Sequence, residues 1–180
     1  MEKGYIQIYT GEGKGKTTAS LGVVLRSLGE GLKVAMAQFV KSPDFKYNEM
    51  KALEWLKNCK ECQGEFVVRQ FGKGCCCHGE PSNADFEGAE RALNQAKEWI
   101  MSGEYDIVIL DEVNIALHLK LIPLEKVVEL LENKPESVEV ILTGRHAPEE
   151  LYEMADLVTE MKEIKHYFRK GVLARAGIEK

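Results

Sequence analysis

A strand-like segment, a glycine-rich loop and a helical pattern follow one another without interruption near the start of the chain. Tyr5–Thr10 is rich in β-branched and aromatic residues, residues 11–18 read Gly-Glu-Gly-Lys-Gly-Lys-Thr-Thr, and an apolar stripe at helical spacing runs from Leu21 to Leu28. Consecutive backbone N–H groups in such a loop can surround phosphate oxygens, and the start of the helix adds roughly +0.5 charge. This order predicts a phosphate-binding loop within an α/β fold.

The loop departs at one position from the strict phosphate-loop pattern G-x-x-x-x-G-K-[ST], because Thr10 stands where the pattern has glycine. Lys16 supplies a point charge for the phosphates, and the Thr17 hydroxyl is a ligand for Mg²⁺. A glycine-rich turn without a ligand is the alternative, but the strand, the Lys-Thr pair and the helix all fall where the mechanism requires them. We therefore expect this variant loop to bind phosphate.

The rest of the chain alternates strand-like runs with helical stripes, which is typical of a parallel α/β sheet. Ser82-x-x-Asp85 predicts a capping box at the start of one helix, which Gly103 ends, and Pro123 predicts the first turn of another. The apolar run Ile107–Leu110 has no polar position, which favours a central strand covered by helices on both faces. The sequence predicts a single domain over residues 1–180, a P-loop NTPase-like, mostly parallel central sheet of about six strands with helices on both faces. The expected strands are Tyr5–Thr10, Lys33–Phe39, Phe66–Phe71, Asp106–Leu110, Val138–Thr143 and Asp156–Met161.

Composition excludes some classes of protein. Lys and Arg number 24 against 29 Asp and Glu, a net charge of −5, so the chain lacks the basic footprint of a nucleic-acid-binding protein. No apolar run approaches the roughly 18 residues of a membrane-spanning helix, and the start of the chain has no signal-like apolar stretch. We expect a cytoplasmic protein that contacts neither nucleic acid nor membrane.

Two adjacent acids follow the predicted central strand. Asp111 and Glu112 would lie at the carboxyl edge of the sheet, where α/β proteins bind ligands. Mg²⁺ takes one or two carboxylates besides phosphates and waters, so Thr17 with Glu112 or Asp111 predicts a magnesium site. The alternative is a solvated acidic turn. From these residues alone, the chain reads as a P-loop ATPase or kinase in which Glu112 is the base.

Six segments, taken together and in order, resemble the P-loop type of ATP:corrinoid adenosyltransferase, the family that makes adenosylcobalamin. The resemblance spans nearly the whole chain. It implies attack of a reduced Co(I) corrinoid on C5′ of ATP with triphosphate as the leaving group, an ATP bound in the reversed sense, Mg²⁺, a flavoprotein-type electron donor and a homodimer. The segments are Thr10–Thr18, Gln38–Lys41, Leu110–Leu117, Thr143–Arg145, Lys165–Gly171 and Ala176–Glu179.

The resemblance also implies roles for individual residues. Lys16, Thr17 and Glu112 would be the catalytic residues, and Thr17 with Glu112 would hold magnesium, supported by Asp111. The residues expected to line the nucleotide or corrinoid pocket are Thr10, Gly11, Glu12, Gly13, Lys14, Gly15, Lys16, Thr17, Thr18, Gln38, Lys41, Asn114, Arg145, Lys165 and His166. For those outside the loop, the alternative is a surface or helix-capping role.

The chain departs from the family after the third strand, where bacterial members often carry bulky groups that press on the corrin. Here the stretch from Phe71 to Gly79 is mostly glycine and cysteine. A corrinoid and ATP carrier with poor turnover is therefore a further alternative to the enzyme, and Phe71 is the one bulky group left in the stretch.

The cysteines suggest a second metal site. Cys59 and Cys62 form a C-x₂-C pair, and Cys75, Cys77 and His78 follow as a second cluster, a spacing that resembles zinc or iron sites. Free thiols in a reducing compartment are the alternative.

Overall fold

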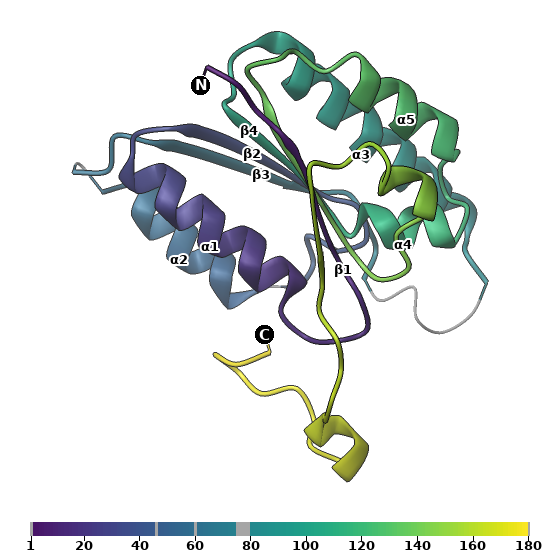
Figure 1. Cartoon of the computed structure of the whole chain (residues 1–180). Coiled ribbons are helices and arrows are strands. Elements are labelled where there is room, and N and C mark those ends of the chain that lie inside the picture. Colours follow the sequence, from purple (N-terminus) through teal and green to yellow (C-terminus); the bar gives the residue numbers. More distant parts are fainter. Residues whose placement is uncertain (1, 46, 60, 75–79, 180) are drawn as a thin grey trace.

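A computed structural model describes residues 2–45, 47–59, 61–74 and 80–179. Strands and helices alternate over most of this length (Figure 1). The strands are β1 (Ile6–Thr10), β2 (Lys33–Gln38), β3 (Glu65–Gln70), β4 (Ile107–Asp111), β5 (Glu139–Thr143) and β6 (Leu157–Glu160). The helices are α1 (Lys16–Gly29), α2 (Asn48–Lys57), α3 (Asn83–Ser102), α4 (Val113–His118) and α5 (Leu124–Glu132), with short 3₁₀ turns η1 (Glu149–Leu151) and η2 (Tyr167–Lys170).

The six strands form one sheet in the order β3-β2-β4-β5-β1-β6, and every pairing is parallel. β4 lies between β2 and β5, and all five of its residues are buried. The prediction of a mostly parallel sheet of about six strands with Ile107–Leu110 at its centre is confirmed. Each end of the six expected strands lies within one residue of the corresponding end of the observed strand.

Helices cover both faces of the sheet, as predicted (Figure 1). Along β4, Ile107 and Ile109 pack with side chains of α1 and α2, whereas Val108 and Leu110 pack with α3, α4 and α5. Successive residues of a strand point to opposite faces, so an unbroken apolar run supplies both cores at once. No helix in the described part of the chain combines the length and the hydrophobicity that a membrane crossing needs.

The helix signals read from the sequence mark real boundaries. Ser82 and Asp85 form the predicted capping box at the start of α3, and Gly103 ends that helix in the left-handed conformation. Pro123 precedes α5 as its N-cap, one residue earlier than the predicted first-turn position. α2 was not predicted, because its residues show no distinct apolar stripe.

Parallel strands bring their carboxyl ends to one edge of the sheet, which is where α/β proteins bind ligands. The loop between β1 and α1, the residues after β2 and the acids that end β4 all lie at this edge. The sheet thus gathers residues far apart in the sequence into one site.

Candidate functional site

The loop between β1 and α1 is held against the end of β6. The N–H of Gly13 donates to the carbonyl of Met161 at 2.6 Å. A Cβ atom on Gly13 would lie 2.6 Å from the same oxygen, so only glycine allows this approach. Gly15, the N-cap of α1, has φ of 120°, a conformation that side chains strongly disfavour. The glycines therefore set both the position and the curvature of the loop.

Lys16 folds back across this loop. Its Nζ donates to the carbonyls of Gly11 and Gly13, both at 2.7 Å. The side chain is buried, and burial lowers the pKa of its ammonium, while the nearby Glu112 carboxylate acts in the opposite direction. A cation at the start of a helix, enclosed by a loop, is well placed to receive phosphate oxygens in exchange for the two carbonyls.

Asp111 is the buried acceptor around which the sheet edge is assembled. Its Oδ1 accepts from the hydroxyls of Thr17 at 2.9 Å and Thr143 at 2.8 Å. Its Oδ2 accepts from Nε2 of Gln38 at 2.8 Å and lies 3.5 Å from Nζ of Lys41. The carboxylate joins α1, β2 and β5, and its partners compensate its burial.

Glu112 differs from its neighbour in almost every respect. Its backbone has φ of 63°, and its N–H donates to Oγ1 of Thr143 at 3.0 Å. Within the described residues, its carboxylate has no hydrogen-bonding partner, and it faces a cavity. Burial raises the pKa of this carboxyl, and the charge of Asp111 raises it further.

This pair of acids fits a magnesium ion. The donors available beside the phosphate loop are the Thr17 hydroxyl and the Glu112 carboxylate, both hard oxygen ligands of the kind Mg²⁺ takes. A half-buried carboxylate that has no hydrogen-bonding partner among the described residues, next to a second carboxylate, is a group that a divalent cation would stabilise. Asp111 already has four polar neighbours and accepts from Thr17, so it would orient that hydroxyl from behind.

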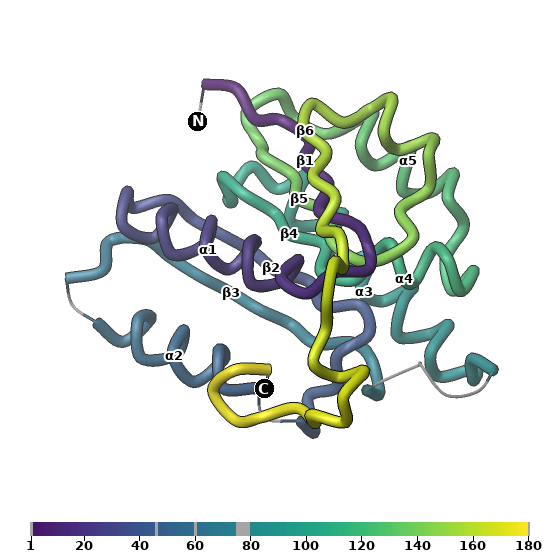
Figure 2. The backbone as a smooth tube through the Cα atoms, turned by 60° about the horizontal axis from the view of Figure 1, so that its bottom comes forward, coloured from purple at the N-terminus to yellow at the C-terminus, as the bar shows by residue number. Residues whose placement is uncertain are grey.

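One cavity of about 630 Å³ connects the loop to Glu112. This volume lies within the range of roughly 300–1,000 Å³ that is usual for small-molecule sites. Figure 2 shows that the N-terminus of α1, the start of α2 and the C-terminal segment lie close to one another, and residues of all three line the cavity. The lining residues are Gly13, Lys14, Gly15, Lys16, Thr17, Thr18, Leu21, Lys41, Tyr47, Asn48, Glu49, Ala52, Glu112, Arg145, His166, Gly177, Ile178 and Glu179.

Lys41 stands between the acids and α2. Its Nζ lies 3.5 Å from Asp111 and 3.4 Å from Oε1 of Glu49, and 4.9 Å from the ring centroid of Tyr47. Burial acts to lower the pKa of Lys41, but the carboxylates of Asp111 and Glu49 more than offset it, so the pKa is raised. The side chain therefore remains a cation in the wall of the cavity.

Several residues predicted for the pocket lie close to it but outside its lining. Glu12 binds Nη1 of Arg145 at 3.2 Å and lies 3.6 Å from Nδ1 of His146, so it ties the loop to the segment after β5. Asn114 donates to the carbonyl of Gly144 at 3.1 Å beneath that segment. The others outside the lining are Thr10, Gly11, Gln38, Asp111 and Lys165; Thr10, Gln38 and Asp111 are buried, and Lys165 is exposed.

The predicted cysteine site falls largely outside the described residues. Cys75, Cys77 and His78 are not described, and Cys59 and Cys62 are free thiols. Cys59 donates to Glu61 at 3.1 Å, and Cys62 lies 3.6 Å from the carbonyl of Gly64. Among the described residues, no group of three or more metal-ligating side chains is found.

Two parts of the cavity wall were not assigned roles from the sequence. One is the first turns of α2 with the preceding Tyr47, and the other is the chain end from Gly177 to Glu179. The sequence around α2 contains no recognisable motif. Residues 177–179 belong to Ala176–Glu179, one of the segments that carry the family resemblance, and this resemblance was the signal that could have pointed to them.

The comparison with protein families decides which of the possible functions applies. The model of the ATP:corrinoid adenosyltransferase BtuR/CobO/CobP family matches residues 2–179. The chain belongs to this family. Among its relatives, a corrinoid adenosyltransferase of a Sinorhizobium species is 41% identical over 99% of this chain and 81% of its own length. The corrinoid adenosyltransferase of Escherichia coli K12 is 35% identical over 99% of this chain and 86% of its own length.

The match extends to corrinoid adenosyltransferase CobA of Salmonella typhimurium, which is 33% identical over 99% of this chain and 86% of its own length. Among solved structures, the flagellar accessory protein FlaH of Methanocaldococcus jannaschii has a TM-score of 0.61 at 14% identity. It covers 89% of this chain and 72% of that one. At this identity the likeness shows the P-loop NTPase-like fold alone. The predicted family and fold are both confirmed.

Proposed function

We propose that the cavity between the phosphate loop, Glu112 and the C-terminal segment binds ATP and presents its C5′ carbon to a reduced corrinoid. As a member of its family, the protein is an enzyme that transfers the adenosyl group of ATP to corrinoids in cobalamin biosynthesis. The observation that carries the assignment is the family match over residues 2–179, combined with a phosphate loop and a carboxylate, Glu112, that line one cavity. The roles of individual residues below are our proposal.

In this reaction the protein has to grip a leaving group. The Co(I) centre of the corrinoid substrate is the nucleophile, the bond from C5′ to the triphosphate oxygen breaks, and the electron pair leaves with the triphosphate. No general base is required. Lys16, the N–H groups of the loop and the start of α1 would stabilise the charge that develops on the triphosphate.

Mg²⁺ would neutralise part of the triphosphate charge when it is bound. Thr17 and Glu112 would hold it, with Asp111 orienting the Thr17 hydroxyl at 2.9 Å. Lys41 and Arg145 add positive charge to the same cavity wall. Holding both substrates in one orientation supplies the rest of the catalysis.

The alternatives are less well supported. A P-loop ATPase or kinase with Glu112 as base would produce ADP or transfer phosphate, but the named relatives above are corrinoid adenosyltransferases. A poorly active carrier would bind ATP and corrinoid without forming the cobalt–carbon bond. The three functions differ in their products.

An anaerobic assay with ATP, Mg²⁺ and a chemically reduced corrinoid tests the proposal. We expect an alkylated corrinoid, followed by its absorbance, and one triphosphate per product. Formation of ADP without corrinoid would instead support the hydrolase, and binding of both substrates without product in a single turnover would support the carrier.

Four other features are also part of the proposal. A homodimer and a transient flavoprotein-type electron donor are proposed from the family resemblance, and a cytoplasmic location and a single domain spanning residues 1–180 are proposed from the sequence. Sedimentation equilibrium, reduction of the bound corrinoid by a flavoprotein, cell fractionation and cooperative unfolding test them in turn. Zinc or iron at the cysteines stays a prediction, which metal analysis of chelator-free protein decides.

A further inference from the structure

The C-terminal segment turns back toward the phosphate loop after leaving the sheet. In Figure 1 it descends from β6 and returns below the start of α1, and in Figure 2 its end lies beside α2. Gly177, Ile178 and Glu179 line the same cavity as Gly13–Thr18. We call residues 166–179 the tail. Its residues His166 and 177–179 form one wall of the cavity, although the loop lies about 150 residues earlier in the sequence.

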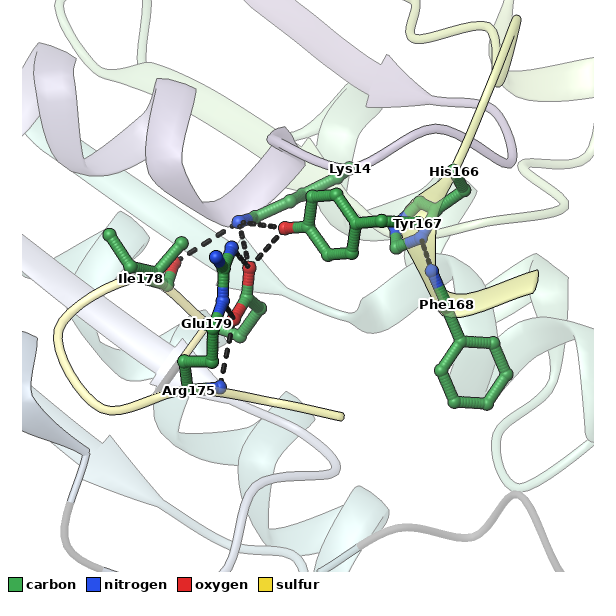
Figure 3. A network of polar contacts seen from close by, with 7 residues as sticks. All are labelled: Lys14, His166, Tyr167, Phe168, Arg175, Ile178 and Glu179. Atoms are coloured by element: carbon green, nitrogen blue, oxygen red, sulfur yellow. Dashed lines mark hydrogen bonds and ion pairs between the residues drawn. The ribbon is translucent and has the colours of Figure 1, made fainter. Parts of the chain in front are cut away.

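Lys14 of the loop holds the tail in this place. Its Nζ donates to the hydroxyl of Tyr167 at 3.2 Å, to the carbonyl of Ile178 at 3.1 Å and to Oε1 of Glu179 at 3.0 Å (Figure 3). A lysine ammonium has three N–H donors, so these acceptors use all of them. Lys16 makes no comparable contact, since its donors point to the carbonyls of the loop itself.

Glu179 is in turn fixed within the tail. Arg175 donates from Nη2 to Oε1 at 3.1 Å and from Nε to Oε2 at 3.2 Å, a two-pronged pairing, and its backbone N–H donates to Oε2 at 2.8 Å. The Tyr167 hydroxyl also donates to this carboxylate, and the Arg175 guanidinium lies 4.9 Å from the centroid of the Tyr167 ring (Figure 3). Hydrogen bonds from Arg175 and then Tyr167 hold the pKa of Glu179 well below its usual range, so the carboxylate is charged.

The geometry makes the tail a wall and not a plug. The cavity of about 630 Å³ exists with the tail in contact with the loop, so tail and ligand do not compete for that volume. The cluster contains two cations, Lys14 and Arg175, and one carboxylate, a formal charge of +1 that does not repel a triphosphate. Lys16 and the start of α1 remain available to the phosphates.

We propose that Glu179 and Tyr167 are positioning residues for the nucleotide, acting through Lys14 to hold the tail as a wall of the ATP cavity. This inference rests on the proposed function, in that it takes ATP as the ligand of the cavity. It adds residues to the site for which the family resemblance gave no role.

The test is Glu179→Ala, with Glu179→Gln and Arg169→Ala as matched controls. Glu179→Gln keeps an acceptor oxygen for Lys14 and Arg175. Arg169 pairs with Glu163 at 2.6 Å within the C-terminal segment, away from the cavity lining. We expect Glu179→Ala to raise the KM and the Kd for ATP about fivefold to tenfold, with kcat changed less than twofold, because orientation of the loop and tail is lost. Glu179→Gln should recover most of this loss, and Arg169→Ala should have no effect.

A double-mutant cycle with Lys14→Met gives the second readout. If Lys14 and Glu179 act on the nucleotide through each other, the double variant Lys14→Met/Glu179→Ala should bind ATP no more weakly than whichever single variant binds ATP more weakly. Fully additive losses would overturn the proposal, as would an unchanged Kd in Glu179→Ala. If both Glu179 variants bind ATP with a lower Kd than the wild type, the Glu179 carboxylate competes with the nucleotide as an anion and does not position it, which also overturns the proposal.

Titration calorimetry with ATP alone separates this inference from the proposed function. If the wild-type protein binds ATP but forms no alkylated corrinoid, the adenosyltransferase activity fails while the Kd values still decide the role of Glu179.

Discussion

The two walls of the nucleotide cavity are built in different ways. The phosphate loop lies between β1 and α1, packs against the end of β6 and places Lys16 among backbone carbonyls. The tail has no strand, only a short 3₁₀ turn, and reaches the loop through exposed polar groups centred on Lys14 and Glu179. Under our proposal, binding of the triphosphate and closure of the cavity therefore belong to separate parts of the chain.

The largest effect is expected where the loop meets the leaving group. Lys16→Ala should lower kcat by about a hundredfold to a thousandfold, the usual loss when one preorganised electrostatic donor is removed. Lys14→Ala should instead raise the KM for ATP about tenfold and leave kcat within twofold. Steady-state rates at saturating ATP and corrinoid separate the two. Equal losses of kcat in both variants would contradict a division in which Lys16 stabilises the leaving group and Lys14 acts only on the binding of ATP.

Glu112→Gln should weaken the binding of Mg²⁺ and stabilise the ligand-free protein against unfolding. Loss of the charged ligand is expected to raise the Mg²⁺ concentration needed for half-maximal activity by at least about tenfold. The native state raises the pKa of this carboxyl, so folding favours its protonated form and loses stability as the pH rises through the raised value. Glutamine resembles that protonated form, so the magnesium-free variant should melt about 2–4 °C higher at pH 7.

The same shift gives a pH profile. As the pH falls toward the raised pKa of Glu112, protonation competes with Mg²⁺, so the acid limb of kcat/KM should lie at higher pH than an ordinary glutamate gives. Raising the Mg²⁺ concentration should move this limb to lower pH. If the acid limb of the kcat/KM profile does not shift with the Mg²⁺ concentration, it reports the titration of a group other than Glu112.

Thermal unfolding sharpens the contrast between the walls. Thr143→Val removes a donor from buried Asp111 and an acceptor from the N–H of Glu112, and should cost about 2 kcal/mol. Glu179→Ala breaks contacts that lie near the surface, of which only the hydrogen bond from Tyr167 is partly buried, and should leave Tm unchanged within about 1 °C. Calorimetric scans without ligand measure both. A fall in Tm for Glu179→Ala that matches Thr143→Val would place the tail within the cooperative core.

The smallest change is expected in the pH dependence of the tail. Glu179 has a lowered pKa, so its contribution is complete above the ordinary glutamate value and is lost only as the pH falls through the lowered one. The ratio of ATP Kd values between Glu179→Ala and wild type should therefore be the same at pH 6 and pH 8. A ratio that shrinks at pH 6 would show that another group controls the contact.

Much of the fold could be read from the sequence, because local patterns determine it. The unbroken apolar run of β4 requires burial on both faces, and Gly103 and the Ser82–Asp85 capping box end and begin α3 where they were expected. α2 escaped prediction because only Leu53 of its ten residues is buried, so it carries little apolar periodicity.

The site was predictable where one motif contains both the residues and their geometry, as in Gly13–Thr18. The site was less predictable where side chains from distant segments of the chain contact one another. Asp111 and Glu112 are adjacent and chemically alike, and only the structure shows one to be fully paired and the other to face the cavity. Glu179 lies 165 residues from Lys14, and no pattern in the sequence joins them.

The left-handed backbone at Glu112, with φ of 63°, assigns different tasks to two like charges. Asp111 is the last residue of β4 and is buried among its polar partners, whereas Glu112 is the first residue after the strand and lines the cavity. A chain carrying the same two acids in the opposite order would have equal charge and composition, yet it would place the longer side chain at the buried position and the shorter one at the cavity.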